Sequence, residues 1–256
     1  MINHEFKKKF GQNFISDKNL LNAICDDANL QQDDEVLEIG AGAGALTEAI
    51  NAKCGRVVSY EIDKDLQPHL TSLKLANTKF VFGDIMDFSI EEIERQFEGR
   101  YKMIANLPYY ITTPIIFKFL NGSKRIESLT IMVQKEVAQR MVAKSGKDYG
   151  VLSIMIDFYG DAQINRVVSR KMFYPQPNVD SAIVTVNIKD KHPDIDKKDF
   201  YKFIQTVFSM RRKTLKNNLT QGGYDKEKIA SLGEEILKKR GEEFDINSLI
   251  EIYKKL

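Results

Sequence analysis

The segment Asn106-Leu107-Pro108-Tyr109 holds the residues of this chain that are best suited to chemistry. The amide oxygen of Asn106 and the backbone carbonyl of Leu107 can accept both hydrogens of an exocyclic amine, such as N6 of adenine. Because the N6 lone pair is delocalised into the ring, two such bonds would pull the nitrogen toward tetrahedral geometry and aim its lone pair at a sulfonium methyl. Pro108 makes this backbone rigid, and Tyr109 offers a stacking face for an extruded base. An Asn-Pro turn with a core tyrosine is the alternative interpretation.

A glycine-rich turn, Gly40-Ala41-Gly42-Ala43-Gly44, joins the first expected strand to the helix after it. Glycines lack the Cβ atoms that would hold a ligand away from the backbone, and open sheets bind ligands at this carboxyl edge. With Ala45 the spacing also satisfies the dinucleotide pattern G-x-G-x-x-[G/A], so the turn alone leaves an NAD-dependent dehydrogenase open. A tight turn without a ligand is the structural alternative.

Two acidic residues follow at the ends of the next two expected strands. Glu61 stands about 20 residues after the turn, where a carboxylate can accept hydrogen bonds from both ribose hydroxyls. Asp84 ends the third strand, and its carboxylate can accept a bond from an adenine amino group. The pair predicts an adenosine lying across the strand ends, a moiety that NAD and S-adenosylmethionine share.

Short β-branched runs alternate with amphipathic segments from residue 35 onward, which predicts an α/β fold with a mostly parallel sheet. Strands are expected at 36–39, 57–60, 80–82, 102–105, 129–133, 162–168 and 182–188, the last two forming an antiparallel edge. Helices are expected at 20–28 with Asp17 as cap, 46–52, 66–73 and 113–120.

The composition shifts at residues 189–194, which are typical of a linker. Two domains are therefore expected, at 1–188 and 189–256. The second should be small and all-helical, with helices at 200–210, 213–219, 226–239 and 246–256.

The tail also carries the excess of positive charge. The whole chain has a net charge of +2, whereas residues 189–256 hold 16 Lys and Arg against 12 Asp and Glu. Within this tail, residues 211–216 carry four positive charges and no acid, which favours a polyanion partner, and a solvated helix face is the alternative interpretation. The phosphate-contact candidates are Arg211, Arg212, Lys213 and Lys216, with Arg140, Lys144 and Lys147 as weaker ones.

Composition excludes several classes of protein. Two cysteines and three scattered histidines predict neither a disulfide framework nor a metal site. The polar, lysine-bearing start predicts no secretory leader, and no apolar run approaches the roughly 18–20 residues that span a bilayer. We expect a protein of the reducing cytoplasm, without a metal and without a membrane anchor.

Together these motifs resemble those of the KsgA-type ribosomal RNA adenine dimethyltransferases. The similarity extends to Gly11-Gln12-Asn13-Phe14, to the run from Phe173 to Ser181, and to residues 134–140, 148–153 and 211–215. It implies a Rossmann-like methyltransferase fold and an S-adenosylmethionine site. The implied donor-site residues are Asn13, Ile15, Gly40, Gly42, Glu61, Asp84 and Asn106.

The resemblance also implies an activity. Asn106 to Tyr109 would be catalytic, and Phe173 would stack on the target adenine opposite Tyr109. The substrate would be two adjacent adenines in a hairpin loop near the 3′ end of small-subunit (16S) ribosomal RNA, methylated on N6 during small-subunit biogenesis. The implied partner is the immature small subunit, and a monomer is expected.

Three alternatives share some of these features. They are a large-subunit methylase of the erythromycin-resistance type, a DNA N6-adenine methylase and an assembly factor whose catalysis is secondary. Leu107 before the proline and the run from Arg211 to Leu215 favour the KsgA type by resemblance. A DNA methylase more often shows Pro-Pro-Tyr after its Asp or Asn. Ala41 and Ile15 depart mildly from the family pattern, which more often has proline and leucine there.

Overall fold

The structure is a computed structural model, and it describes residues 14–256. The chain forms two compact units. The first runs up to Ala138 and includes Gln163–Ile188, and the second joins Gln139–Ala162 to Lys189–Leu256. The predicted domain boundary at residue 188 stays a prediction.

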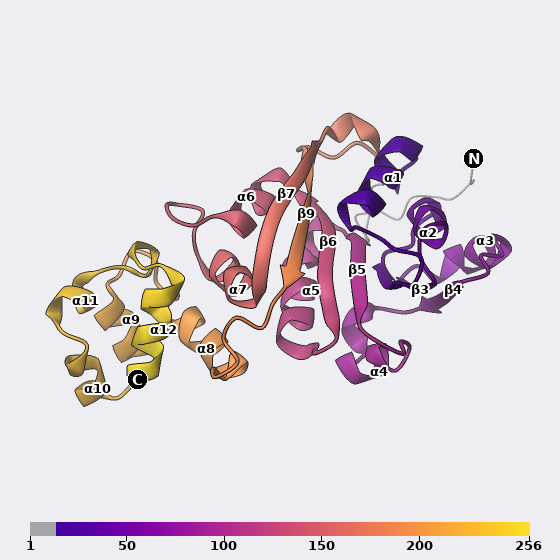
Figure 1. Ribbon diagram of the computed structural model, residues 1–256. Helices are drawn as coiled ribbons and strands as arrows, with labels where there is room; N and C mark the ends of the chain where they lie inside the picture. Colours follow the sequence, from indigo (N-terminus) through magenta and orange to yellow (C-terminus); the bar gives the residue numbers. More distant parts are fainter. Residues whose placement is uncertain (1–13) are drawn as a thin grey trace. The chain divides into compact units, whose positions relative to one another are not determined.

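A seven-stranded sheet is the framework of the α/β part (Figure 1). In sheet order its strands are β4 (Thr78–Phe82), β3 (Arg56–Glu61), β2 (Glu35–Ile39), β5 (Tyr101–Asn106), β6 (Ile126–Gln134), β9 (Ser181–Ile188) and β7 (Gly160–Val168). The strands from β4 to β6 pair in parallel, and β9 pairs antiparallel to β6. The predicted mostly parallel sheet with an antiparallel addition is confirmed.

A second, two-stranded sheet pairs β1 (Phe14–Ile15) antiparallel with β8 (Phe173–Tyr174), with Ile15 opposite Phe173. Two-residue strands are too short to show a period in the sequence, so these two were not predicted. This pairing places the segment that follows Asn13 beside the signature segment that begins at Phe173.

The first unit contains the helices that surround the parallel strands. They are α1 (Lys18–Asp27), α2 (Ala45–Asn51), α3 (Gln67–Ser72), α4 (Ile90–Glu94) and α5 (Tyr109–Gly122), with the 3₁₀ turns η2 (Lys64–Leu66), η3 (Ile85–Asp87) and η4 (Arg170–Met172). Asp17 caps α1 as predicted, since its Oδ1 accepts from the Leu20 N–H at 2.8 Å. Helix α5 begins four residues before the expected position. The expected bounds would place Pro114 in the first turn, where proline is favoured, whereas in the structure it lies inside the helix.

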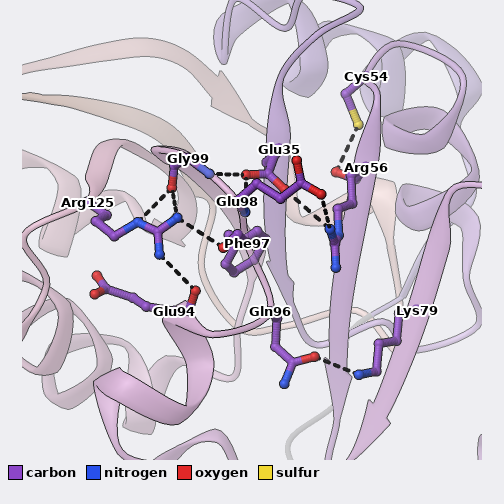
Figure 2. A network of polar contacts seen from close by, with 10 residues as sticks. All are labelled: Glu35, Cys54, Arg56, Lys79, Glu94, Gln96, Phe97, Glu98, Gly99 and Arg125. Atoms are coloured by element: carbon purple, nitrogen blue, oxygen red, sulfur yellow. Dashed lines mark hydrogen bonds and ion pairs between the residues drawn. The ribbon is translucent and has the colours of Figure 1, made fainter.

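Polar contacts fix the amino ends of the strands (Figure 2). Glu35, the first residue of β2, accepts the backbone N–H groups of Glu98 and Gly99 at 2.8 and 2.7 Å. Arg125, just before β6, donates to the carbonyls of Phe97 and Gly99. The backbone N–H and carbonyl groups of the turn before β5 therefore have charged hydrogen-bond partners. The carboxyl ends of the same strands carry the candidate site.

The second unit is largely helical. After α6 (Lys135–Val142), which begins in the first unit, its elements are α7 (Val151–Tyr159), α8 (Lys197–Val207), α9 (Leu215–Gln221), α10 (Lys226–Ser231), α11 (Glu234–Lys238), η5 (Gly241–Glu243) and α12 (Ile246–Lys255). Phe158 of α7 stacks on Phe200 of α8 with ring centroids 4.6 Å apart, and Tyr253 of α12 meets Phe200 edge-on at 5.4 Å. Helix α7 therefore shares an aromatic core with the tail helices.

One helix prediction in the tail is wrong. The segment 226–239 was expected to be a single helix, but α10 and α11 are separate, and Gly233 between them has φ 86°. A right-handed helix cannot continue through that conformation. None of the helices in residues 14–256 has the length and apolar character needed to cross a membrane.

Candidate functional site

The glycine turn and the Asn106 segment meet where two neighbouring strands end. In the parallel pair β2–β5, Ile39 lies opposite Ala105, so Gly40 and Asn106 continue side by side. Gly40 has φ 87°, and a Cβ there would lie 3.3 Å from the backbone oxygen of Asn106. Glycine therefore permits both the left-handed turn and the close approach of the two segments.

Both segments line one pocket at this edge of the sheet, together with the strand end of β3 and the β1 segment. The predicted residues that the pocket brings together are Ile15, Gly40, Gly42, Glu61, Asn106, Leu107, Pro108 and Tyr109. Asn13 lies outside the described residues. Residues that were not predicted also line it, among them Phe14, Leu21 and Ile62.

A second pocket continues from the first across the strand ends and shares Gly40, Ile62, Leu107 and Pro108 with it. Asp84 lines this second pocket, beside Gly83 and Ile85. Ile62 and Ile85, which form apolar walls of these pockets, were not predicted from the sequence, although each directly follows a predicted acid. A flat purine needs such apolar walls as well as polar partners, so the residue after each acid was the available signal.

Glu61 joins the turn to the wall of the pocket. Its Oε2 accepts from the Gly42 N–H at 2.7 Å and its Oε1 from the Asp63 N–H at 2.8 Å. Burial raises the pKa of this carboxyl, and the N–H bonds partly offset the increase. The two carboxylate oxygens offer about four lone-pair sites, more than these backbone N–H groups occupy, so the carboxylate can also accept from a hydroxyl donor. Gly42 has no side chain to cover the backbone, and a Cβ there would lie 3.1 Å from the Phe14 ring. These residues fit a ligand that contains a ribose.

Glu38, in β2 two residues before the glycine turn, is fully buried. Its Oε2 accepts from Thr47 Oγ1 at 2.6 Å and from Ser59 Oγ at 2.5 Å, so it connects β2 with α2 and β3. Its Oε1 has no hydrogen-bond partner among the described residues. Burial outweighs the two hydroxyl bonds and raises the pKa of Glu38 from 4.5 to about 7.

This pKa predicts a pH dependence of stability. Since folded Glu38 holds its proton up to about pH 7 and an unfolded glutamate releases it near 4.5, the free energy of unfolding should fall as pH rises between these values. The loss is on the order of 3 kcal/mol at one pKa unit per 1.36 kcal/mol. Glu38→Gln should remove it, so urea unfolding at pH 5 and pH 8 should show a flatter pH response than the wild type. An equal response in both proteins would contradict this assignment, and the exposed Glu98→Gln serves as control.

Tyr109 is held in the pocket by its hydroxyl. Its Oη lies 2.8 Å from Ser181 Oγ, and burial raises the pKa of the phenol. Phe173 differs from the predicted arrangement, because it is 5% exposed and packs in the core with Ile15 and Leu21. It is not among the residues that line these two pockets. Its stacking on a target base stays a prediction.

Lys118 of α5 supports the loop that carries Asp84. Its Nζ donates to the carbonyl oxygens of Ile85 at 2.9 Å and Met86 at 3.0 Å, and also to that of Phe88. Burial lowers the pKa of Lys118, while Asp84 and other nearby acids act in the opposite direction. Lys118 was not predicted as a site residue, although it is the single cation within the expected helix 113–120.

We expect Lys118→Met to weaken the binding of S-adenosylmethionine, the methyl donor that the resemblance implies. Without the ammonium, three carbonyl groups lose their donor and the loop that bears Asp84 and Ile85 loosens. The Kd for S-adenosylmethionine, measured by calorimetry, should rise about tenfold, which corresponds to roughly 1.4 kcal/mol. The exposed Lys124→Met should bind the donor like the wild type. An unchanged Kd for Lys118→Met would show that the loop holds its shape without this contact.

The predicted phosphate contacts all lie in the second unit, and Arg211 connects two of their groups. Its Nη2 donates to the Lys147 carbonyl oxygen at 2.7 Å and lies 3.4 Å from Glu242. The turn between α8 and α9 therefore meets the loop that bears Lys144 and Lys147, although they are far apart in sequence. Arg140, Arg212, Lys213 and Lys216 are exposed. Lys144 pairs with Asp157 at 2.9 Å and is itself 70% exposed.

Asn218 stabilises the start of this turn by a hydrogen bond to the end of α8. It is buried, and its Nδ2 donates to the carbonyl oxygen of Val207 at 2.6 Å, at the end of α8. A buried amide that closes a helix end in this way fixes the chain that follows it. In residues 14–256, no group of three or more His, Cys, Asp or Glu side chains is placed to hold a metal ion.

Comparison with known proteins gives consistent matches along the chain. A family model described as ribosomal RNA adenine dimethylase matches residues 3–254. The protein named ribosomal RNA small subunit methyltransferase A of Clostridioides difficile is 41% identical over 255 residues, which cover 95% of this chain and 88% of the relative. The protein of the same name from Fusobacterium nucleatum is 38% identical, and 97% of this chain and 96% of the relative are covered.

Two solved structures have the same fold. A dimethyladenosine transferase from Plasmodium falciparum superposes with a TM-score of 0.79 at 23% identity, over 94% of this chain and 98% of that one. The 23S rRNA methyltransferase ErmE superposes with a TM-score of 0.69 at 22% identity, over 95% of this chain and 99% of that one. The predicted Rossmann-like fold is thereby confirmed.

Proposed function

Because this chain belongs to the ribosomal RNA adenine dimethylase family, we propose that it dimethylates N6 of two adjacent adenines in small-subunit (16S) ribosomal RNA. The proposed methyl donor is S-adenosylmethionine, and the proposed target is a hairpin loop near the 3′ end. The observation that carries this proposal is the pocket that Gly40, Glu61 and Asn106 line together, at the ends of three neighbouring strands. Family membership removes the NAD-dependent dehydrogenase that the glycine turn alone left open.

The proposed chemistry is mainly a matter of orientation. Bound S-adenosylmethionine supplies an electrophilic methyl on its sulfonium sulfur. Asn106 Oδ1 and the Leu107 carbonyl accept the two N6 hydrogens, and Tyr109 stacks on the base, which together hold the nitrogen in line. The methylated amine is cationic and releases its proton to solvent, so the site needs no strong general base.

The donor site divides into two parts. Gly40, Gly42 and Glu61 would hold the ribose side, supported by Ile15, and Asp84 would accept from the adenine amino group in the neighbouring pocket. Asn13 is proposed as a further contact by family resemblance. The close approach of the Asn106 backbone to Gly40 and of the Phe14 ring to Gly42 supports this arrangement, since a side chain at either glycine would meet a neighbour.

The proposed RNA surface lies in the second unit. Arg140, Lys144, Lys147, Arg211, Arg212, Lys213 and Lys216 would contact phosphates. The Arg211 contact with the Lys147 carbonyl supports this proposal, because it brings separate basic stretches onto one surface. We propose that the protein acts as a monomer on the immature small subunit.

Two alternative functions are compatible with this fold, a large-subunit target and a role in assembly. A large-subunit target would follow the ErmE neighbour, but that likeness at 22% identity concerns the fold alone. The relatives at 38–41% identity carry the small-subunit name, which supports the small-subunit target. A role in assembly that outweighs catalysis would be supported if a methylation-dead variant still bound precursor subunits.

The test uses purified protein with labelled S-adenosylmethionine and ribosomal subunits from cells lacking the dimethyladenosines. We expect label on two adjacent adenines of the small-subunit RNA, found as dimethyladenosine by mass mapping. The large subunit, and separately NADH with a reducible substrate, serve as controls. Label on the large subunit alone, or on neither, would overturn the proposed function.

A further inference from the structure

We propose that Ser181 is a positioning residue for methyl transfer, and that its hydroxyl sets the ring plane of Tyr109. The inference rests on the proposed function and concerns a residue outside the pocket wall. Ser181 Oγ lies 2.8 Å from Tyr109 Oη, and the side chain of Ser181 is fully buried. The contact joins the catalytic segment after β5 to the first residue of β9, 72 positions along the chain.

Ser181 is itself held from two directions. Within the β6–β9 ladder it lies opposite Gln134. The preceding residue, Asp180, accepts the Lys135 N–H through its carbonyl at 3.0 Å and the Arg170 N–H through Oδ1 at 2.9 Å. The hydroxyl of Ser181 therefore projects from a fixed backbone, as a positioning group must.

Tyr109 needs such a hydrogen bond because its position at the start of α5 does little to fix the orientation of its ring. It is the first residue of α5, after Pro108, and no side chain caps that helix. Rotation about χ2 of tyrosine is a broad torsion that the rotamer does not fix. A hydrogen bond at the far end of the ring removes that freedom. The plane of a stacked base, and with it the direction of the N6 lone pair toward the donor, then depends on the Ser181 bond.

A merely structural role is the competing explanation, because a buried phenol needs a hydrogen-bond partner in any case. The two explanations differ in what they predict for rate and for stability. A structural bond would affect the melting temperature and leave the transfer step alone. If the bond positions Tyr109, its loss in Ser181→Ala should slow transfer. The same substitution should cause no further slowing in Tyr109→Phe, which already lacks the bond.

The experiment is a double-mutant cycle on single-turnover methyl transfer to undermethylated small subunits, at saturating donor. Ser181→Ala and Tyr109→Phe should each slow transfer about tenfold, and the double variant should be no slower than either single, since one shared bond is lost. The Kd for S-adenosylmethionine should stay within about twofold. Thr185→Val, which removes another buried hydroxyl of β9 that is bonded to Thr130, should transfer at the wild-type rate.

Three outcomes would overturn the inference. The first is an unchanged rate for Tyr109→Phe, a variant that keeps the ring and can be measured even if the serine variant does not fold. The second is an unchanged rate for a folded Ser181→Ala. The third is an additive loss of about a hundredfold in the double variant. Absence of transfer by the wild type would overturn the proposed function together with this inference. Normal wild-type transfer with any of the three outcomes would overturn the inference alone.

Discussion

Asn106→Ala is expected to slow single-turnover methyl transfer about 10³-fold while the Kd for S-adenosylmethionine changes only a few fold. The amide oxygen is one of two acceptors proposed to align N6, and removing one preorganised polar group from a reacting centre costs on the order of 10²–10³ in rate. The glycine turn, Glu61 and the loop that carries Asp84 are proposed to hold the donor as well, and this change leaves them in place. Rapid-quench measurement of labelled RNA gives the rate, and calorimetry gives the donor affinity.

Two controls sharpen this test. The exposed Asn22→Ala on α1 should react and bind like the wild type. Asn106→Asp retains a side-chain acceptor and should lose less rate than the alanine variant. Near-normal turnover of Asn106→Ala would show that N6 is aligned by other groups. Loss of donor affinity without a change in the transfer step would instead assign Asn106 to the donor site alone.

The strand-end part of the site was predictable because it depends on local sequence. In a parallel sheet the carboxyl ends of all strands meet at one edge, so finding where each strand ends also places Gly40, Glu61, Asp84 and Asn106. The structure brings all four to that edge. Strand ends are recognised from local signals, namely the alternation of side chains along a strand and the glycine-rich turn after it, and these signals lie within a few residues of each position.

The supporting contacts were not predictable in the same way. Lys118 binds carbonyl oxygens about 30 residues away, and Ser181 meets Tyr109 across 72. In the sequence each is an ordinary lysine or serine, and only the folded neighbourhood gives it a role. Phe173 shows the same limit, since the motif indicated an aromatic residue but not its burial opposite Ile15. Elements of two residues, such as β1 and β8, are too short for any period to appear.

The charged surface of the second unit carries the other large prediction. Arg211→Glu combined with Arg212→Glu should weaken RNA association by about 10- to 100-fold near physiological salt. It should also flatten the slope of log Kd against log salt by one to two units, because each lost phosphate contact removes roughly 0.7–0.9 of a unit. Filter binding or fluorescence anisotropy across a salt series measures both quantities.

The structure separates the two arginines within this prediction. Arg212 is exposed, so Arg212→Glu should reduce the salt slope and leave the melting temperature unchanged. Arg211 also donates to the Lys147 carbonyl, so Arg211→Glu should additionally release the loop at 144–149 and increase its cleavage by protease. Lys198→Glu, an exposed charge reversal in the same unit, should change neither the slope nor the cleavage, which distinguishes local contact from net charge. If Lys198→Glu weakened binding as much as Arg212→Glu, the cluster would act only through total charge, and the assigned phosphate contacts would be wrong.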